Sequence, residues 1–170
     1  MPSLFALAAL AAASPASPAP VMLPLDPVSR QLLDAHNRER ALVGAPPLQW
    51  DPHLARSAIS YGPTLAALGR LQHSPRASRP GQRENLWYGG AYSYLPAQMV
   101  GMWAAEKRFF RPGIYPSVST TGNWYDVSHY TQMIWPTTTH VGCGIYRTGR
   151  SDYLICRYSP PGNRDGRHIP

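Results

Sequence analysis

The chain has 170 residues, of which 44% are hydrophobic, and a formal net charge of +7 at pH 7. That length fits one domain able to bury a single core, and the composition argues against a disordered chain or a polytopic membrane protein. Nearly all the basic residues are arginine, since Lys107 is the single lysine. Such a surface favours anionic partners such as acidic lipid or polysaccharide, although an arginine-rich secreted protein without one has the same composition. No basic run or glycine–aromatic motif indicates a specific nucleic-acid site.

The N-terminal segment has the pattern of an export signal. An apolar run over residues 4–13 is followed by an alanine-, serine- and proline-rich stretch over residues 14–20. The run is too short to span a bilayer and suits a signal peptide with a small-residue cleavage zone. Because no Lys or Arg precedes the run, a low-complexity tail is the alternative. We predict a signal peptide over residues 1–20, a domain over residues 21–170, and a secreted or extracellular protein (periplasmic in a bacterium).

The two cysteines, Cys143 and Cys156, flank a polar turn over residues 147–152. The segments on either side are rich in Val, Ile, Tyr and Leu, which predicts a hairpin with the two sulfurs on neighbouring strands. An exported protein reaches an oxidising compartment, so we predict a disulfide, with free buried thiols as the alternative in a reducing one. Two cysteines without a C-x-x-C motif argue against a zinc thiolate site.

Two helix starts follow one rule, at Leu25-Asp26-Pro27 and Trp50-Asp51-Pro52. Each places Asp at the N-cap and Pro at the first helical position, where the amides have no partner inside the helix. The first helix is predicted to end near Val43. The second is predicted to continue to Leu68, with a kink or break at Gly62-Pro63, because proline removes an amide donor and crowds the preceding turn.

The remaining elements complete the predicted architecture. A third helix covers residues 97–110, and a fourth covers residues 127–135 with Asp126 as its cap. Strands are expected over residues 85–88, 141–146 and 153–158. Helices combined with a small antiparallel sheet predict an α+β domain, most naturally a three-layer α-β-α sandwich with the sheet between the helices.

Four residues could together form a functional site: His73, Glu84, Glu106 and His129. Glu106 lies on the apolar stripe of the third predicted helix, where a carboxylate needs hydrogen-bond donors or a cation. Two imidazoles and two carboxylates are a sensible ligand set for zinc or another divalent ion. They can equally satisfy one another as two carboxylate–imidazole pairs without a metal. The residues alone do not decide between these interpretations.

The motifs around these residues resemble those of the CAP superfamily, which comprises the cysteine-rich secretory, antigen 5 and pathogenesis-related 1 proteins. The resemblance extends from about Val28 to Asn163 and includes the segments Ser128–Trp135, Val141–Gly144 and Cys156–Asn163. It implies a cleft tetrad of His73, Glu84, Glu106 and His129. Five motifs carry it in order: His36-Asn37-x-x-Arg40, His73-Ser74, Glu84-Asn85, Trp103 with Glu106, and His129-Tyr130-Thr131-Gln132. Asn37 and Arg40 are interpreted as structural.

The resemblance also implies a function. CAP proteins are associated with sterol or fatty-acid binding and with divalent metal in the cleft, so we predict a secreted, non-catalytic binding protein. His73 and His129 are the candidate ligands for zinc or another divalent cation. The candidate contacts for sterol or another lipid lie in a glycine- and aromatic-rich segment, where glycines permit mobility, although ordinary aromatic packing gives the same pattern. These contacts are Trp87, Tyr88, Tyr92 and Tyr94.

A metal-dependent, protease-like hydrolase is the alternative function. In it, Glu84 or Glu106 acts as general base on a water held by the metal between the two histidines. The absence of H-E-x-x-H and G-x-S-x-G motifs argues against this hydrolase. A third interpretation makes the cleft purely structural, with the glutamates and histidines neutralising one another. The sequence does not indicate an oligomeric state.

Overall fold

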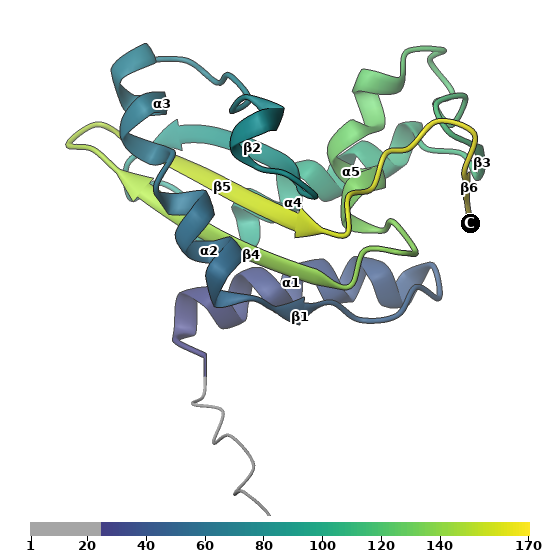
Figure 1. Cartoon of the computed structure of the whole chain (residues 1–170), viewed down its shortest axis with the longest axis horizontal. Helices are drawn as coiled ribbons and strands as arrows, with labels where there is room; N and C mark the ends of the chain where they lie inside the picture. Colours follow the sequence, from purple (N-terminus) through teal and green to yellow (C-terminus); the bar gives the residue numbers. More distant parts are fainter. Residues whose placement is uncertain (1–24) are drawn as a thin grey trace, which may run out of the picture.

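The structure is a computed structural model that describes residues 25–170 (Figure 1). The predicted signal peptide over residues 1–20 lies outside the described residues. Within the described part, no helix has both the length and the apolar character needed to cross a membrane. The helices are α1 (Pro27–Leu42), α2 (Pro52–Ile59), α3 (Gly62–Leu68), α4 (Pro96–Ala104) and α5 (Ser128–Met133), with 3-10 turns η1 (Arg76–Ser78), η2 (Ala105–Phe109) and η3 (Trp124–Val127). The strands are β1 (Gln49–Trp50), β2 (Arg83–Gly90), β3 (Gly113–Ile114), β4 (His140–Arg147), β5 (Ser151–Ser159) and β6 (His168–Ile169).

The main sheet lies between two layers of helices, with strand order β1-β4-β5-β2. Strands β2, β4 and β5 are antiparallel, as predicted. Helices α2 and α3 contact β4 and β5 on one face, whereas α1, α4 and α5 pack together on the other (Figure 1). The predicted three-layer α-β-α sandwich is therefore confirmed. One addition is β1, which pairs in parallel with β4 over only two residues, too short a segment to show a strand periodicity.

The predicted helix starts and the predicted break are present. The Asp26 carboxylate accepts hydrogen bonds from the amides of Val28 and Ser29 at 3.0 Å each, which begins α1. The Asp51 carboxylate caps α2 in the same way. Helix α2 ends at Ile59 and α3 begins at Gly62, so the Gly-Pro pair separates two helices. Proline at the first turn of α3 replaces an amide that would have had no partner inside the helix.

Strand β4 presents different residues to the two helical layers. Gly142 and Gly144 face α2, and a Cβ atom at either position would collide with that helix. The alternate residue Cys143 is buried and lies opposite Cys156 on β5, and the two sulfurs form the predicted disulfide. The close approach of α2 thus depends on the glycines, while the other face of the hairpin joins the core.

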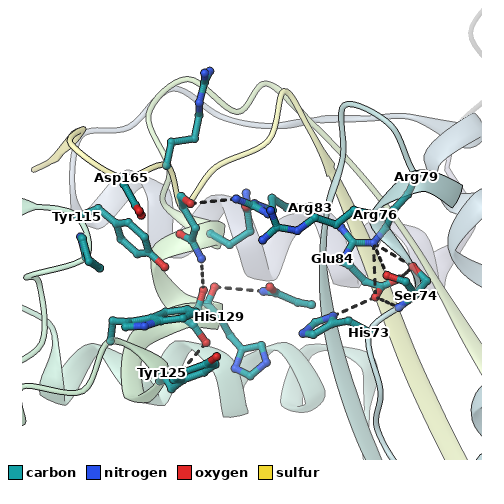
Figure 2. A pocket seen from close by; sticks show the side chains of 17 residues that line it. His73, Ser74, Arg76, Arg79, Arg83, Glu84, Tyr115, Tyr125, His129 and Asp165 are labelled. Carbon is teal, nitrogen blue, oxygen red and sulfur yellow. Dashed lines mark hydrogen bonds and ion pairs between the residues drawn. The ribbon is translucent and has the colours of Figure 1, made fainter.

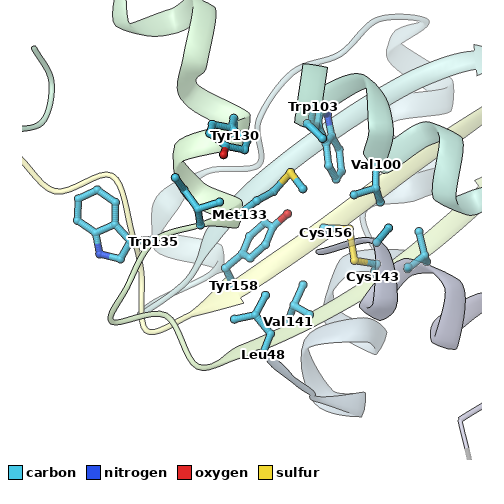
Figure 3. Packing of buried hydrophobic residues seen from close by; sticks show 14 of the residues in the cluster. Leu48, Val100, Trp103, Tyr130, Met133, Trp135, Val141, Cys143, Cys156 and Tyr158 are labelled. Carbon is cyan, nitrogen blue, oxygen red and sulfur yellow. A yellow bond between two sulfur atoms is a disulfide. The ribbon is translucent and has the colours of Figure 1, made fainter. Parts of the chain in front are cut away.

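The main hydrophobic core lies between the sheet and helices α1, α4 and α5, and it includes Trp103, Met133 and Tyr158 (Figure 3). Arg40 of α1 is fully buried beside it. Its guanidinium donates to four backbone carbonyl oxygens, two of them at the end of α5 and just beyond it. The side chain of Asn37 pairs with both backbone groups of Leu48. Both residues therefore act structurally, as predicted, and Arg40 holds the end of α5 against α1.

Two local predictions around the site are wrong. The third helix ends at Ala104 and continues as the 3-10 turn η2, which contains Glu106. Asp126 does not cap the fourth helix, because its carboxylate accepts from Thr121 and Asn123 instead. The first amides of α5 find their acceptor in Glu106, a residue from another element. A cap supplied from a distance leaves no local sequence signal.

Candidate binding cleft

A cleft of about 950 Å³ opens where the start of β2, the η1 turn, the η3–α5 junction and residues 163–165 meet (Figure 2). Three residues of the predicted tetrad line it: His73, Glu84 and His129. The fourth, Glu106, lies behind His129 and holds it by a hydrogen bond. The structure thus brings the tetrad to one region, but it arranges the residues as two separate His–Glu pairs.

The first pair joins His73, which follows α3, to Glu84 of β2. Nδ1 of His73 lies 3.0 Å from Oε1 of Glu84. The same carboxylate accepts from the Ser74 amide at 3.0 Å and from the Ser74 hydroxyl at 2.8 Å. The Glu84 side chain is 0% exposed, whereas that of His73 is 54% exposed. The carboxylate is therefore an internal anchor, and the imidazole extends from it into the cleft.

Two arginines balance the buried charge of Glu84. Arg157 of β5 places Nη2 3.4 Å from Oε2, and Arg79 places Nε 3.9 Å from Oε1. Burial by itself would raise the pKa of Glu84, but the hydrogen bonds from His73 and Ser74 and the charge of Arg79 lower it, and the net shift is downward. Glu84 is consequently a carboxylate in the folded protein at neutral pH.

The second pair joins Glu106 of η2 to His129 in the first turn of α5. Nδ1 of His129 lies 2.6 Å from Oε1 of Glu106. The other carboxylate oxygen accepts from the backbone amides of His129 and Tyr130 at 3.0 Å each. The imidazole also lies parallel to the Trp103 ring, with 5.9 Å between centroids. Glu106 therefore fixes both the start of α5 and the orientation of the histidine on it.

Both pairs leave Nε2 of the histidine free. Each carboxylate accepts a hydrogen bond from Nδ1, so in the neutral ring the proton lies on Nδ1 and Nε2 keeps its lone pair. Among residues 25–170, neither Nε2 has a hydrogen-bond partner. Nor does any group of three or more His, Cys, Asp and Glu side chains in that range have an arrangement able to hold a metal ion. His73 and His129 are therefore the lining residues that present an imidazole nitrogen to the cleft, each oriented by its own glutamate.

Sequence reasoning missed the two arginines that hold Glu84. Arg157 has a recognisable signal, because it interrupts the otherwise uncharged strand segment that follows Asp152, and a charge in a buried strand requires a partner. It is 4% exposed and also donates to the Ser57 hydroxyl of α2. Arg79 has no comparable signal, since an arginine in a loop is ordinarily solvated, whereas Ser74 belongs to the His73-Ser74 motif.

The candidate lipid contacts do not form one surface. Trp87 is only 8% exposed and packs against Tyr94 in an edge-to-face arrangement, so its predicted role at the surface is wrong. The adjacent Gly89 and Gly90 belong to β2, and the Trp87 ring occupies the position where a Cβ of Gly89 would lie. Tyr88 and Tyr92 are 48% and 78% exposed. Gly89 therefore makes room for an indole, and both glycines pair with β5 in the sheet.

The comparisons with known proteins agree with this architecture. The sequence profile described as "CAP: Cysteine-rich secretory protein family" matches residues 33–158. Pathogenesis-related protein 1C of Nicotiana tabacum is 37% identical over 137 residues, which cover 79% of this chain and 76% of the relative. The crystal structure of Na-ASP-1 superposes with a TM-score of 0.69 at 26% identity, covering 85% of this chain but only 41% of that protein.

A second solved structure, that of NaASP2 with Zn²⁺, has a TM-score of 0.68 at 22% identity and covers 85% of each chain. At that identity the likeness concerns the fold. The family profile spans the segment from α1 to β5, which contains both His–Glu pairs and the disulfide. From this match and from its similarity to pathogenesis-related protein 1C, the chain belongs to the cysteine-rich secretory protein family, the CAP superfamily.

Proposed function

We propose that this protein is a secreted, non-catalytic binding protein whose cleft takes a divalent cation through Nε2 of His73 and Nε2 of His129. One observation carries the proposal: each imidazole is oriented by a carboxylate at Nδ1 and presents its other nitrogen without a partner among residues 25–170. Metal-binding histidines commonly have this outer carboxylate, which fixes the ring and increases its basicity. A bound cation would act as an electrophile toward a ligand in the cleft.

The chemistry of the donors favours zinc or a similar ion, because neutral imidazole is a borderline-soft ligand. Two imidazoles leave the remaining positions to water or to a bound molecule. The glutamates do not fit as direct ligands, since Glu84 is buried with both oxygens occupied and Glu106 is bonded to two amides. The solved structure of NaASP2 contains Zn²⁺ in a protein of the same fold, which supports the choice of zinc as the first cation to test.

The hydrolase alternative is not favoured by these contacts. A general base must accept a proton from water and therefore needs an accessible oxygen within hydrogen-bond reach. The side chain of Glu84 is 0% exposed, and its oxygens accept from His73, Ser74 and Arg157. Glu106 has its oxygens on His129 and on two backbone amides. Both carboxylates are engaged in holding other groups.

Secretion is supported by the cysteine pair. Cys143 and Cys156 are buried opposite each other on β4 and β5 and form a disulfide. Such bonds persist in oxidising compartments and are rare where thiols are kept reduced. The signal-peptide pattern of residues 1–20 is consistent with export. Detection of the mature chain outside the producing cell, with a new N-terminus near residue 20, would test this part of the proposal.

The cation site is tested by calorimetric titration of the metal-stripped protein with zinc. We expect saturable binding at one site, lost in the double variant His73→Ala/His129→Ala. The matched control is His53→Ala/His140→Ala, which removes two imidazoles outside the cleft and should leave zinc binding unchanged. Absence of zinc binding by the folded wild-type protein, or an equal loss in both variants, would overturn the proposal.

Lipid binding is a second candidate function, now confined to the exposed residues at the end of β2 and the start of α4. Tyr92 is 78% and Leu95 63% exposed. The Arg147 guanidinium lies 3.7 Å from the centroid of the Tyr92 ring and is paired with the buried Asp152 carboxylate, so it packs against this surface and holds Tyr92 in place. We expect Tyr92→Ala/Leu95→Ser to abolish co-sedimentation with vesicles containing sterol and acidic phospholipid. No binding by the wild-type protein would exclude this function.

A further inference from the structure

The charge of the cleft is unevenly distributed. Four arginines line it, whereas the acidic side chains of the lining are Glu84 and Asp165. Arg83 donates to the carbonyl oxygens of Gly162 and Asn163, which are neutral acceptors, and Asp165 is the acidic residue that offsets part of its charge. The guanidinium groups of Arg76 and Arg164 have no hydrogen bond or ion pair within residues 25–170, and both residues are exposed.

Arg83 lies close to two other cations of the cleft. Burial lowers the pKa of Arg83 and the neighbouring charges of Arg76 and Arg79 lower it further, whereas Asp165 opposes the shift. Glu84 does not neutralise the group, because Arg79 and Arg157 already share its charge. A cleft lined by several cations attracts an anion. The planar guanidinium can also donate two hydrogen bonds to one carboxylate, sulfate or phosphate group.

The other wall of the cleft is aromatic. Trp124 and Tyr125 stack with 3.9 Å between ring centroids, and Tyr115 meets Trp124 edge to face. Tyr125 is 66% exposed. Figure 2 shows Tyr115 and Tyr125 on the side of the cleft away from Arg76 and Arg79. A ligand that spans the cleft would therefore place a ring face against the aromatic groups and an anionic group against the guanidiniums.

The basic surface continues beyond the cleft. A second hollow of about 380 Å³ is lined by three basic residues, Arg164, Arg167 and His168, and by Trp135, Pro136, Thr137 and Pro160. Arg164 lines both hollows, so they adjoin at this residue. A ligand longer than one ring would follow positive charge from Arg76 across Arg164 to Arg167. This continuity favours a chain with repeated anionic groups over a single small anion.

We propose that the cleft binds an acidic polysaccharide, a chain of sugar rings bearing carboxylate or sulfate groups. The aromatic wall would contact one sugar ring, while Arg76, Arg83 and Arg164 would bind the acidic groups. An acyl chain is a poorer fit, because the apolar side chains of the lining all come from residues 115–125 and the other lining residues are polar or charged. A single-stranded nucleic acid would use successive stacking surfaces, but Trp135 in the second hollow is buried and presents no ring face.

This inference rests on the proposed function in one respect, namely that the cleft is the ligand site of the protein. It does not require a bound cation. The test therefore uses the full chain in a chelating buffer, with binding followed by calorimetry. The probes are an oligogalacturonate for carboxylate, a heparin oligosaccharide for sulfate, a neutral maltooligosaccharide and a poly(dT) oligonucleotide. The first two probes distinguish the two sources of negative charge.

We expect one or both acidic saccharides to bind and the neutral saccharide not to bind. Arg76→Gln/Arg164→Gln should weaken that binding by about tenfold or more and reduce its dependence on salt, since removing one charge-assisted hydrogen bond weakens binding by about tenfold. Tyr125→Ala should weaken binding without changing the salt dependence. The matched control is Arg30→Gln/Arg38→Gln, which removes two exposed charges from α1 and should keep the wild-type affinity.

Several outcomes would overturn the inference: no binding of either acidic saccharide, tighter binding of poly(dT), equal binding of the neutral saccharide, or an equal loss in the α1 control. The two proposals fail separately. Saccharide binding in chelator together with no zinc binding would retain this inference and reject the cation site. Zinc binding at His73 and His129 without saccharide binding would do the reverse.

Discussion

The two His–Glu pairs use the same residue types in opposite ways. In the pair of His73 and Glu84, the carboxylate side chain is 0% exposed and the imidazole 54% exposed. In the pair of His129 and Glu106, the carboxylate is 19% and the imidazole 30% exposed. The first carboxylate is thus embedded in the protein with its histidine extended outward. The second pair is partly covered throughout.

The partners of the two carboxylates explain this difference. Glu84 is surrounded by the side chains of Arg79 and Arg157, so its charge belongs to a buried ionic cluster. Glu106 is bonded to backbone amides at the start of α5, and its histidine is supported by the Trp103 ring. The sequence motifs of the two pairs look alike, but the first carboxylate belongs to a buried ionic cluster and the second caps a helix. Stability should depend mainly on the carboxylate in the first pair and on both members in the second.

The largest expected effect is that of Glu84→Gln. Removing this charge leaves Arg157 and Arg79 buried without their counterion, which we expect to lower the free energy of unfolding by about 3–5 kcal/mol. Urea denaturation at neutral pH measures the loss. The matched control is Glu39→Gln, which breaks the ion pair with Lys107, whose side chain is 47% exposed, and should cost about 1 kcal/mol or less. Equal losses in the two variants would contradict an ionic role for Glu84.

A third histidine, His36, also makes the stability of the protein depend on pH, in a range above that of Glu84. Burial lowers the pKa of His36 from 6.5 to about 4, with the hydrogen bond to the Leu32 carbonyl opposing the shift and the charge of Arg40 adding to it. The unfolded chain therefore takes up a proton between pH 6.5 and about 4 that the folded protein does not. Stability should fall by about 3 kcal/mol as the pH falls through that window.

This pH dependence is measured by urea denaturation over a series from pH 7 to pH 4. His36→Gln should flatten the slope, whatever its cost at neutral pH. Glu84 affects stability at lower pH, because its pKa in the folded protein lies below the ordinary value of 4.5. Its contribution to the free energy of unfolding is therefore complete above pH 4.5 and is lost as the pH falls through the folded pKa. An unchanged slope in His36→Gln would show that another group governs the transition above pH 4.5.

The next effect is that of Glu106→Ala. This change removes the acceptor for two amides of α5 and for Nδ1 of His129, so we expect a loss of about 2 kcal/mol in the free energy of unfolding. The matched control is Asp126→Ala, the residue that local sequence favours as the cap. Because Asp126 contacts Thr121 and Asn123 instead, it should cost less. A greater loss in Asp126→Ala would contradict capping of α5 by Glu106.

Local patterns account for much of the fold. The two Asp-Pro helix starts, the break at Gly62-Pro63 and the hairpin with its disulfide follow from residues adjacent in sequence. The end of the third helix was not predictable in this way, because an apolar stripe looks similar in an α-helix and in a short 3-10 extension. The cap of α5 was also missed, since Glu106 lies 23 residues from the amide that it binds.

The candidate site was predictable in its residues but not in its arrangement. The family motifs identify His73, Glu84, Glu106 and His129, yet they do not indicate which groups meet. Arg157 contacts Glu84 across 73 residues, through pairing of β2 with β5. The arginines on one wall and Tyr125 on the other come from segments that no local pattern brings together. Only the folded topology separates the tetrad into a buried ionic pair and a helix-start pair.

The smallest effects should come from the histidines, and their order should be the reverse of that for the glutamates. His129→Ala loses a 2.6 Å hydrogen bond and the packing against the Trp103 ring, so we expect a cost of about 1–2 kcal/mol. His73→Ala removes a half-exposed ring whose carboxylate keeps its hydrogen bonds with Ser74 and Arg157, and it should cost about 0.5 kcal/mol or less. Urea denaturation of both variants measures this order. If His73→Ala costs as much as His129→Ala, the two pairs are equivalent after all, and the division of roles drawn from their burial is wrong.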